Sequence, residues 1–154
     1  SSDAAGSMDP RYRFIDDPEN PGWMVGPEPD SGRFMDVIGR IRACVESPTV
    51  SRLRVQPLER HRNIVGTVHG GFMMALIDQA LFIGPAMLEV PGMRGGLTID
   101  CSCQFLRPAL FEKALDVVVE LLRERGGMAF VRGTVEQDGE AVVAFSGTVR
   151  KARD

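Results

Sequence analysis

One carboxylate in this sequence lies inside an almost uninterrupted apolar stretch. From Phe72 to Ile83 nearly every residue is apolar, yet Asp78 occupies the middle of the run, with Gln79 beside it. An unpaired carboxylate among apolar side chains is costly, so its side of the element is wet or the residue serves chemistry. Such a carboxylate could act as a general base or as a nucleophile. The structural alternative is a buried aspartate with its hydrogen bonds satisfied.

A second group of candidates comes just before the apolar run. His69, Gly70 and Gly71 lie where a helix would begin, and the first backbone N–H groups of a helix have no partners within it. The helix dipole is positive there and glycine allows a ligand to come close, so these amides could stabilise an oxyanion. Two glycines also make an ordinary tight turn. Asn63 could offer its amide to a carbonyl or a water, or it could make an Asx turn.

The apolar run predicts a helix that begins near Gly70 and ends near Ile83. Its apolar side chains point all round the axis, which is typical of a buried helix, and about 12 residues are too few to span a bilayer. Asp78 is eight residues beyond Gly70, roughly 12 Å along the axis. One reacting carbonyl cannot touch both groups of one chain. If both act at one centre, two antiparallel helices from two subunits must lie side by side, which predicts an isologous dimer with composite sites.

Two strands are expected before the helix, at residues 43–46 and 49–59. In the second of them we expect Val50, Leu53 and Val55 on the buried face, because polar residues alternate with them.

Four more strands are expected after the helix, at residues 97–106, 114–123, 128–136 and 140–151. The first alternates, with Leu97, Ile99, Cys101, Cys103 and Phe105 on its apolar face. That pattern puts Thr98 on the polar face, from which it reaches the helix only near the strand end. The Asp138-Gly139 pair signals a hairpin. Short connections favour antiparallel pairing, so the predicted class is α+β, with one antiparallel sheet wrapped around one long central helix.

The expected domain organisation is an irregular N-terminal arm, residues 1–32, followed by a single domain, residues 33–154. The domain would open with a short amphipathic helix between Gly32 and Arg42, and part of residues 1–8 is expected to be an expression scar. The apolar residues of the arm are expected to lie on the domain or on a neighbouring subunit; they are Tyr12, Phe14, Trp23 and Met24.

Composition narrows the function classes. A net charge of −3 and a pI near 5.4 do not indicate the basic surface that binds nucleic acid. The sequence contains no run of 18 apolar residues, so no membrane span is expected. Cys44, Cys101 and Cys103 are an odd number without disulfide spacing, which favours a reducing compartment such as the cytoplasm. The Cys101-x-Cys103 pair has no partner pair at zinc spacing, so we expect it to be structural and expect no metal.

The segment from Asn63 through His69-Gly70-Gly71, followed by Asp78, resembles the signature of the hotdog-fold acyl-CoA thioesterases. The likeness is to the phenylacetyl-CoA thioesterase-like branch of the 4-hydroxybenzoyl-CoA thioesterase superfamily, and it covers about residues 45–151. It implies a hotdog fold, a double-hotdog homodimer with composite active sites, and dimers that often pair into tetramers. It implies no cofactor, because CoA is part of the substrate.

The resemblance also implies roles for single residues. Asp78 would be the catalytic carboxylate, acting as general base on water or as nucleophile on the thioester. Gly70, with Gly71, would supply the amide that polarises the carbonyl. Asn63 would help to orient the carbonyl or the water, and His69 would support the loop and contact the thioester.

Thr98 falls where relatives carry the Ser or Thr that holds the attacking water. The favoured function is therefore hydrolysis of an acyl- or aryl-CoA thioester to the free acid and CoA. Two alternatives stay open: a hotdog dehydratase or hydratase, which would use His69 with a carboxylate, and a non-catalytic acyl-CoA-binding protein.

Overall fold

The computed structural model describes residues 13–153, so the expected scar at residues 1–8 and Tyr12 lie outside the described part. The elements before the central helix are β1 (Ile15–Asp16), β2 (Met24–Val25), α2 (Met35–Ile38), β3 (Arg42–Ser47), β4 (Val50–Val55) and a 3-10 turn (Glu59–His61). From the central helix onward they are α3 (Gly70–Met87), β5 (Leu97–Phe105), β6 (Leu115–Arg125), β7 (Met128–Gln137) and β8 (Glu140–Arg150).

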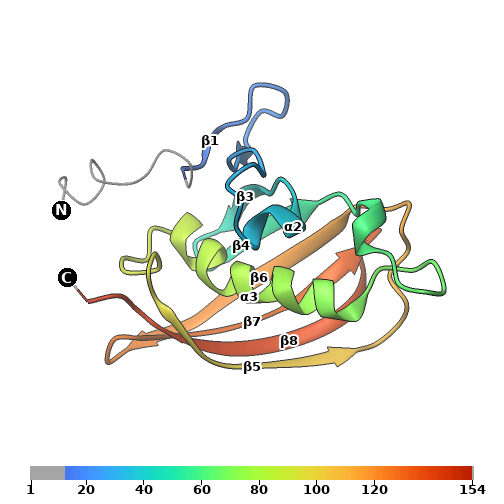
Figure 1. Cartoon of the computed structure of the whole chain (residues 1–154). Coiled ribbons are helices and arrows are strands. Elements are labelled where there is room, and N and C mark those ends of the chain that lie inside the picture. The colour runs from blue at the N-terminus through green and yellow to red at the C-terminus, as the bar shows by residue number, and fades with distance from the viewer. Residues whose placement is uncertain (1–12, 154) are drawn as a thin grey trace.

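The strands of the described residues form one antiparallel sheet in the order β1-β2-β3-β4-β6-β7-β8-β5. The sheet curls beneath α3, and the arm strands lie at its far edge above β3 (Figure 1). The predicted α+β architecture, an antiparallel sheet wrapped around one long helix, is confirmed.

The central helix is longer than the sequence pattern indicates. It spans 18 residues and contains Pro85 in its last turn, where the ring has no N–H to bond to the carbonyl of the preceding turn. By length and composition alone, α3 could cross a membrane. However, 44% of it is buried inside this fold, and the core helices of soluble proteins pass the same test. The helix length of about 12 residues expected from the sequence was wrong, because α3 has 18 residues.

Only one side of α3 is covered by the sheet. Leu76, Ile77, Ala80 and Leu81 are fully buried there and form the centre of the core. On the other side Met74 is 46% exposed, and Gln79, Phe82 and Ile83 are half-buried. The expectation of a helix buried on every side was wrong for the single chain. Its apolar outer side is where a ligand or a second subunit could pack.

Both hairpin turns between the last strands use left-handed backbone. Gly126 and Gly127 have φ of 59° and 78°, and Asp138 and Gly139 have φ of 52° and 76°. Two consecutive positive φ angles are the mark of the type I′ turn, whose twist matches that of the strands. The hairpin predicted from Asp138-Gly139 is confirmed.

The segment after Gly32 departs from the prediction. The expected amphipathic helix is the single turn α2, which ends at Gly39 with φ of 92°. Beyond that glycine the chain turns into β3, so Ile41 is buried from a loop position rather than from a helix face.

The buried face of β4 is also shifted from the expectation. Ser51, Leu53 and Val55 face the core, whereas Val50 is only half-buried. Ser51 is fully buried because its hydroxyl donates a 2.9 Å hydrogen bond to the Gly84 carbonyl in the last turn of α3. A buried hydroxyl with a partner costs little, so a polar residue takes a core position that the alternation pattern assigns to an apolar one.

The alternation predicted for β5 is broken by a bulge. Thr98 pairs with Val149 and Asp100 with Thr148, so Ile99 is an extra residue between two ladder positions. A bulge changes the face on which the preceding residue lies. Thr98 therefore points inward with Cys101, whereas Leu97 and Ile99 are exposed. The placement of Thr98 on the polar face was wrong, although its position near the strand end was as expected.

The described part of the arm is partly regular. β1 and β2 add two short strands to the β3 edge of the sheet. Asp17 accepts a 2.8 Å hydrogen bond from Arg42 on β3, and the Arg54 guanidinium lies 4.6 Å from the centre of the Trp23 ring. The arm is thus attached to the body of its own chain.

Candidate active site

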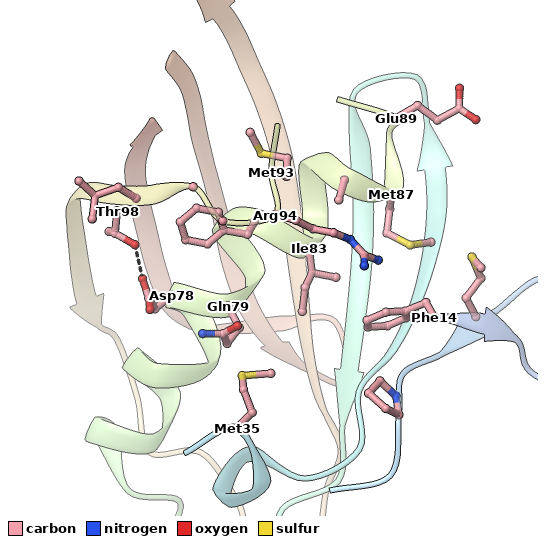
Figure 2. A pocket seen from close by; sticks show the side chains of 17 residues that line it. Phe14, Met35, Asp78, Gln79, Ile83, Met87, Glu89, Met93, Arg94 and Thr98 are labelled. Carbon is pink, nitrogen blue, oxygen red and sulfur yellow. Dashed lines mark hydrogen bonds between the residues drawn. The ribbon is translucent and has the colours of Figure 1, made fainter. Parts of the chain in front are cut away.

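Asp78 lies on the outer side of α3, beside the start of β5. Its Oδ1 accepts a 2.6 Å hydrogen bond from the Thr98 hydroxyl (Figure 2). Charge-assisted hydrogen bonds of this length are among the stronger ones in proteins. The pair depends on the bulge at Ile99, because a regular strand would turn Thr98 away from the helix. Asp78 is half-buried and therefore neither sealed in the core nor free in solvent.

A cavity of about 1100 Å³ opens beside Asp78 and Thr98 and lies over the outer side of α3. Phe82, Ile83 and Met87 from α3 supply part of its lining, and residues 93–98 supply another part. The third part comes from the arm and α2 and consists of Phe14, Met24, Pro27 and Met35. A predominantly apolar cavity with a few polar groups at one point is the usual form of a small-molecule site.

The start of α3 is capped by a histidine side chain. His69 Nδ1 accepts a 2.9 Å hydrogen bond from the Gly71 N–H, so this amide is engaged within the chain. The Phe105 ring packs over Gly70, where a Cβ atom would come within 3.3 Å of it. Two glycine amides were proposed as oxyanion donors. The cap uses the Gly71 N–H, so the Gly70 N–H is the one from which a ligand could accept a hydrogen bond.

Asn63 shapes the loop before the helix. Its Oδ1 accepts hydrogen bonds from the N–H groups of Val65 and Thr67, at 3.1 and 3.0 Å, and its Nδ2 donates to the Thr67 hydroxyl at 2.8 Å. This is the Asx-turn arrangement that the sequence left open as an alternative. The amide holds the loop that leads to His69.

The candidate residues form two groups in one chain. Asp78 and Thr98 are joined by a hydrogen bond, while Gly70 lies two helical turns away, roughly 12 Å along α3. Asn63 and His69 belong with Gly70, in the loop and cap at the helix start.

A second histidine has a structural role that the sequence pattern does not reveal. His61 is 1% exposed and stacks on the Phe72 ring at a centroid distance of 3.6 Å. Its Nδ1 accepts a 2.9 Å hydrogen bond from the Leu58 N–H, and its Nε2–H donates to the Val37 carbonyl. Burial lowers the pKa of His61. The neutral ring fixes the 3-10 turn against the first turn of α3, and its Arg60-His61-Arg62 context gave no signal of burial.

The two cysteines of β5 pack on the core beside Asp78. Cys101 and Cys103 are free thiols with their sulfur atoms 3.9 Å apart. Burial, together with the neighbouring Cys103 and Asp78, raises the pKa of Cys101 to about 12. Because the thiolate is the nucleophilic form, this environment disfavours a reactive role for Cys101 at neutral pH.

Known proteins resemble this chain in sequence and in fold. Human acyl-coenzyme A thioesterase 13 is 25% identical over 97 residues, which cover 63% of this chain and 68% of that protein. The phenylacetic acid degradation protein PaaI of Thermus thermophilus is 25% identical with a TM-score of 0.62, over 77% of this chain and 97% of that one. A hypothetical thioesterase of Streptococcus pneumoniae, whose structure contains coenzyme A, is 17% identical with a TM-score of 0.61, over 73% and 91% of the two chains.

The family profile agrees with these likenesses. The profile described as the thioesterase superfamily matches residues 65–144, which run from the loop before α3 into β8. That range contains Gly70, Asp78 and Thr98, and it leaves the arm outside. The chain has the hotdog fold and belongs to the thioesterase superfamily.

Proposed function

We propose that this protein is an acyl-CoA thioesterase in which Asp78 is the catalytic carboxylate. The observation that carries the proposal is the position of Asp78, held by Thr98 at one point of a large apolar cavity. The cavity suits the hydrocarbon part of an acyl thioester. With the hydrocarbon in the cavity, the thioester carbonyl would lie next to the Asp78 carboxylate. The name of the human relative, an acyl-coenzyme A thioesterase, supports CoA as the thiol.

Two routes are open to the Asp78 carboxylate. As general base it removes a proton from water, whose oxygen attacks the thioester carbonyl carbon while the Thr98 hydroxyl keeps the carboxylate in position. As nucleophile its own oxygen attacks, and water then hydrolyses the mixed anhydride. In both routes the carbon–sulfur bond breaks, the CoA thiolate leaves and takes up the released proton, and the acid is set free.

The oxyanion formed on attack needs a donor that Asp78 cannot provide. The Gly70 amide at the positive end of α3 is suited to this role, but within one chain it lies roughly 12 Å from Asp78. We therefore assign the donor to Gly70 of a second subunit, which makes each site composite.

The free edge of the sheet offers a way to build this dimer. Within residues 13–153, β5 is a terminal strand with β8 on one side only, and its Leu97 and Phe105 are 59% and 49% exposed. Edge strands of this kind pair readily with another chain. Antiparallel pairing of two β5 strands about a two-fold axis would bury this edge and set the two α3 helices in opposite directions.

The positions along β5 fit such a dimer. Thr98, near one end of β5, bonds to Asp78, and Phe105, at the other end, packs over Gly70. If the two-fold axis passes near the middle of β5, Thr98 of one subunit lies opposite Phe105 of the partner subunit. Asp78 then approaches the partner's Gly70, as a composite site requires.

The dehydratase alternative is less well supported. It needs an imidazole near the carboxylate, but the His69 Nδ1 accepts a backbone hydrogen bond at the helix start, so that only Nε2 is left for chemistry. A non-catalytic acyl-CoA-binding protein would use the same cavity. The experiment below distinguishes this alternative from an enzyme.

The test is thiol release, followed with a thiol-reactive dye, from short, medium, long-chain and aryl CoA thioesters. Wild type should turn over at least one of them, and Asp78→Asn should lose turnover while still binding the non-hydrolysable S-alkyl-CoA thioether. Asp100→Asn is the matched control, because Asp100 is exposed on the opposite side of β5, and it should behave like wild type. If all three proteins bind the thioether but none turns over a thioester, the protein is a non-catalytic acyl-CoA-binding protein and not an enzyme.

A further inference from the structure

The wall of the cavity farthest from Asp78 is supplied by the arm. Phe14, Met24 and Pro27 all line the cavity, and all precede the segment that matches the family profile. Figure 2 shows the Phe14 ring across the cavity from the Asp78–Thr98 pair, beyond Ile83. An acyl group whose carbonyl lies at Asp78 and whose chain extends along the cavity would end against this ring.

We propose that the arm is the specificity element of the enzyme and that Phe14 limits the length of the hydrocarbon acyl chain. The proposal rests on the proposed function, since it takes the thioester carbonyl to lie at Asp78. It assigns to the arm a role in choosing the substrate, separate from the chemistry of the helix and β5.

The position of Phe14 is fixed by a close approach to backbone. Gly26 lies beneath the ring, and a Cβ atom there would come within 3.1 Å of the Phe14 Cζ and 3.3 Å of the Ile41 carbonyl oxygen. The Gly26 N–H donates a 2.8 Å hydrogen bond to that same carbonyl. The ring thus rests on a backbone segment that is bonded to the chain just before β3, and it can stop a chain that reaches it.

Two further contacts fix the arm to the sheet. The Asp17 side chain is almost fully buried; it accepts hydrogen bonds from Arg42 at 2.8 Å and from Asn20 at 2.7 Å. Trp23 stacks against Arg54 on β4. Trp23 is the only tryptophan of the chain, so its fluorescence reports whether the arm is still docked when Phe14 is changed.

The rest of the lining is more adaptable than Phe14. Met24, Met35, Met87 and Met93 contribute thioether side chains, which are unbranched and adjust to ligands of different shape. The charged lining residues Glu89 and Arg94 are exposed, so a chain that runs through the interior meets apolar side chains. The expected ligand is a hydrocarbon acyl group that the methionines accommodate and the ring of Phe14 terminates.

The experiment compares wild type with Phe14→Ala and Phe14→Leu. The probes are straight-chain acyl-CoA thioesters from butanoyl to hexadecanoyl, and the matching S-alkyl-CoA thioethers measured by calorimetry. In Phe14→Ala the preferred chain should become longer, and the longest ligands should bind about tenfold more tightly than to wild type, which corresponds to burying about two further methylene groups. Phe14→Leu should lie between the two.

The control is Ile15→Ala at the next residue of the arm, because Ile15 is 52% exposed and does not line the cavity. It should keep the wild-type chain-length profile. An unchanged profile in Phe14→Ala, with Trp23 fluorescence as in wild type, overturns the proposal, and so does an equal shift in Ile15→Ala. The thioether measurements do not need turnover. A shifted binding profile in a protein without activity would therefore contradict the hydrolase while upholding the role of Phe14.

Discussion

The Thr98 hydroxyl lies 2.6 Å from Asp78 Oδ1 because one extra residue in β5, Ile99, turns Thr98 toward the helix. The Asp78 carboxylate thus accepts a hydrogen bond from a side chain that a regular strand would have directed away from the helix. This hydrogen bond connects the apolar helix α3 with the edge strand β5.

Removing the Thr98 hydroxyl should slow turnover without preventing substrate binding. A hydrogen bond to a charged group contributes about 1.5–3 kcal/mol, so kcat of Thr98→Val should fall about 10- to 100-fold. Thr98→Ser keeps the donor and should retain most of the wild-type kcat. Both constants are obtained from thiol-release kinetics with one good substrate. A Thr98→Val enzyme with wild-type kcat would show that the hydroxyl does not support the reaction.

Acid should destabilise the fold through His61. Because burial lowers the folded-state pKa of His61, the unfolded chain takes up a proton first as the pH falls below about 6.5. Its contribution to stability is therefore full above that pH and declines below it, by at most about 1.4 kcal/mol per pH unit. Protonated Nδ1 would also face the Leu58 N–H, a donor against a donor.

Urea unfolding at about pH 7.5 and about pH 5.5 measures this decline. His61→Gln should have a lower free energy of unfolding than wild type at the higher pH. The difference between its values at the two pH values should be much smaller than in wild type. The same pH dependence in wild type and His61→Gln would assign it to other groups.

A methyl group at Gly84 should destabilise the protein although it favours the helix. Alanine is better than glycine in a helix by about 1 kcal/mol. However, a Cβ at Gly84 would lie 2.5 Å from Val119 Cγ1 and 2.8 Å from Val119 Cβ, and overpacking costs about 1–3 kcal/mol. Gly84→Ala should therefore lower the free energy of unfolding measured with urea, and the loss that it causes should be smaller in the Val119→Ala background. A gain in stability from Gly84→Ala alone would mean that β6 moves away easily.

The apolar run around Asp78 was enough to predict the central helix, and the alternation in the neighbouring segments was enough to predict the sheet around it. Those features follow from periodicity, which the amino-acid sequence displays directly. The helix end was harder to predict, because Gly84 and Pro85 look like a stop signal. In the structure Gly84 allows close contact with Val119, and Ser51 satisfies the Gly84 carbonyl, so the helix continues to Met87.

Features that depend on a partner far along the chain could not be predicted. The bulge at Ile99 exists only in the register of β5 against β8. The burial of His61 depends on Phe72 and on the Val37 carbonyl, which belong to separate elements. The arm was predicted to be irregular because prolines separate its short strands, and its pairing with β3 follows from tertiary contacts.

The order of strands has a consequence for the growing chain on the ribosome. β5 follows the helix in the sequence, but its neighbour in the sheet is β8, the last strand of the domain. While the chain is being made, Leu97–Phe105 has no strand to pair with until residues 140–150 have emerged. The bulge that directs Thr98 to Asp78 therefore forms only after β8 has emerged. Until then the chain contains the helix and the paired strands β3, β4, β6 and β7, but no assembled site.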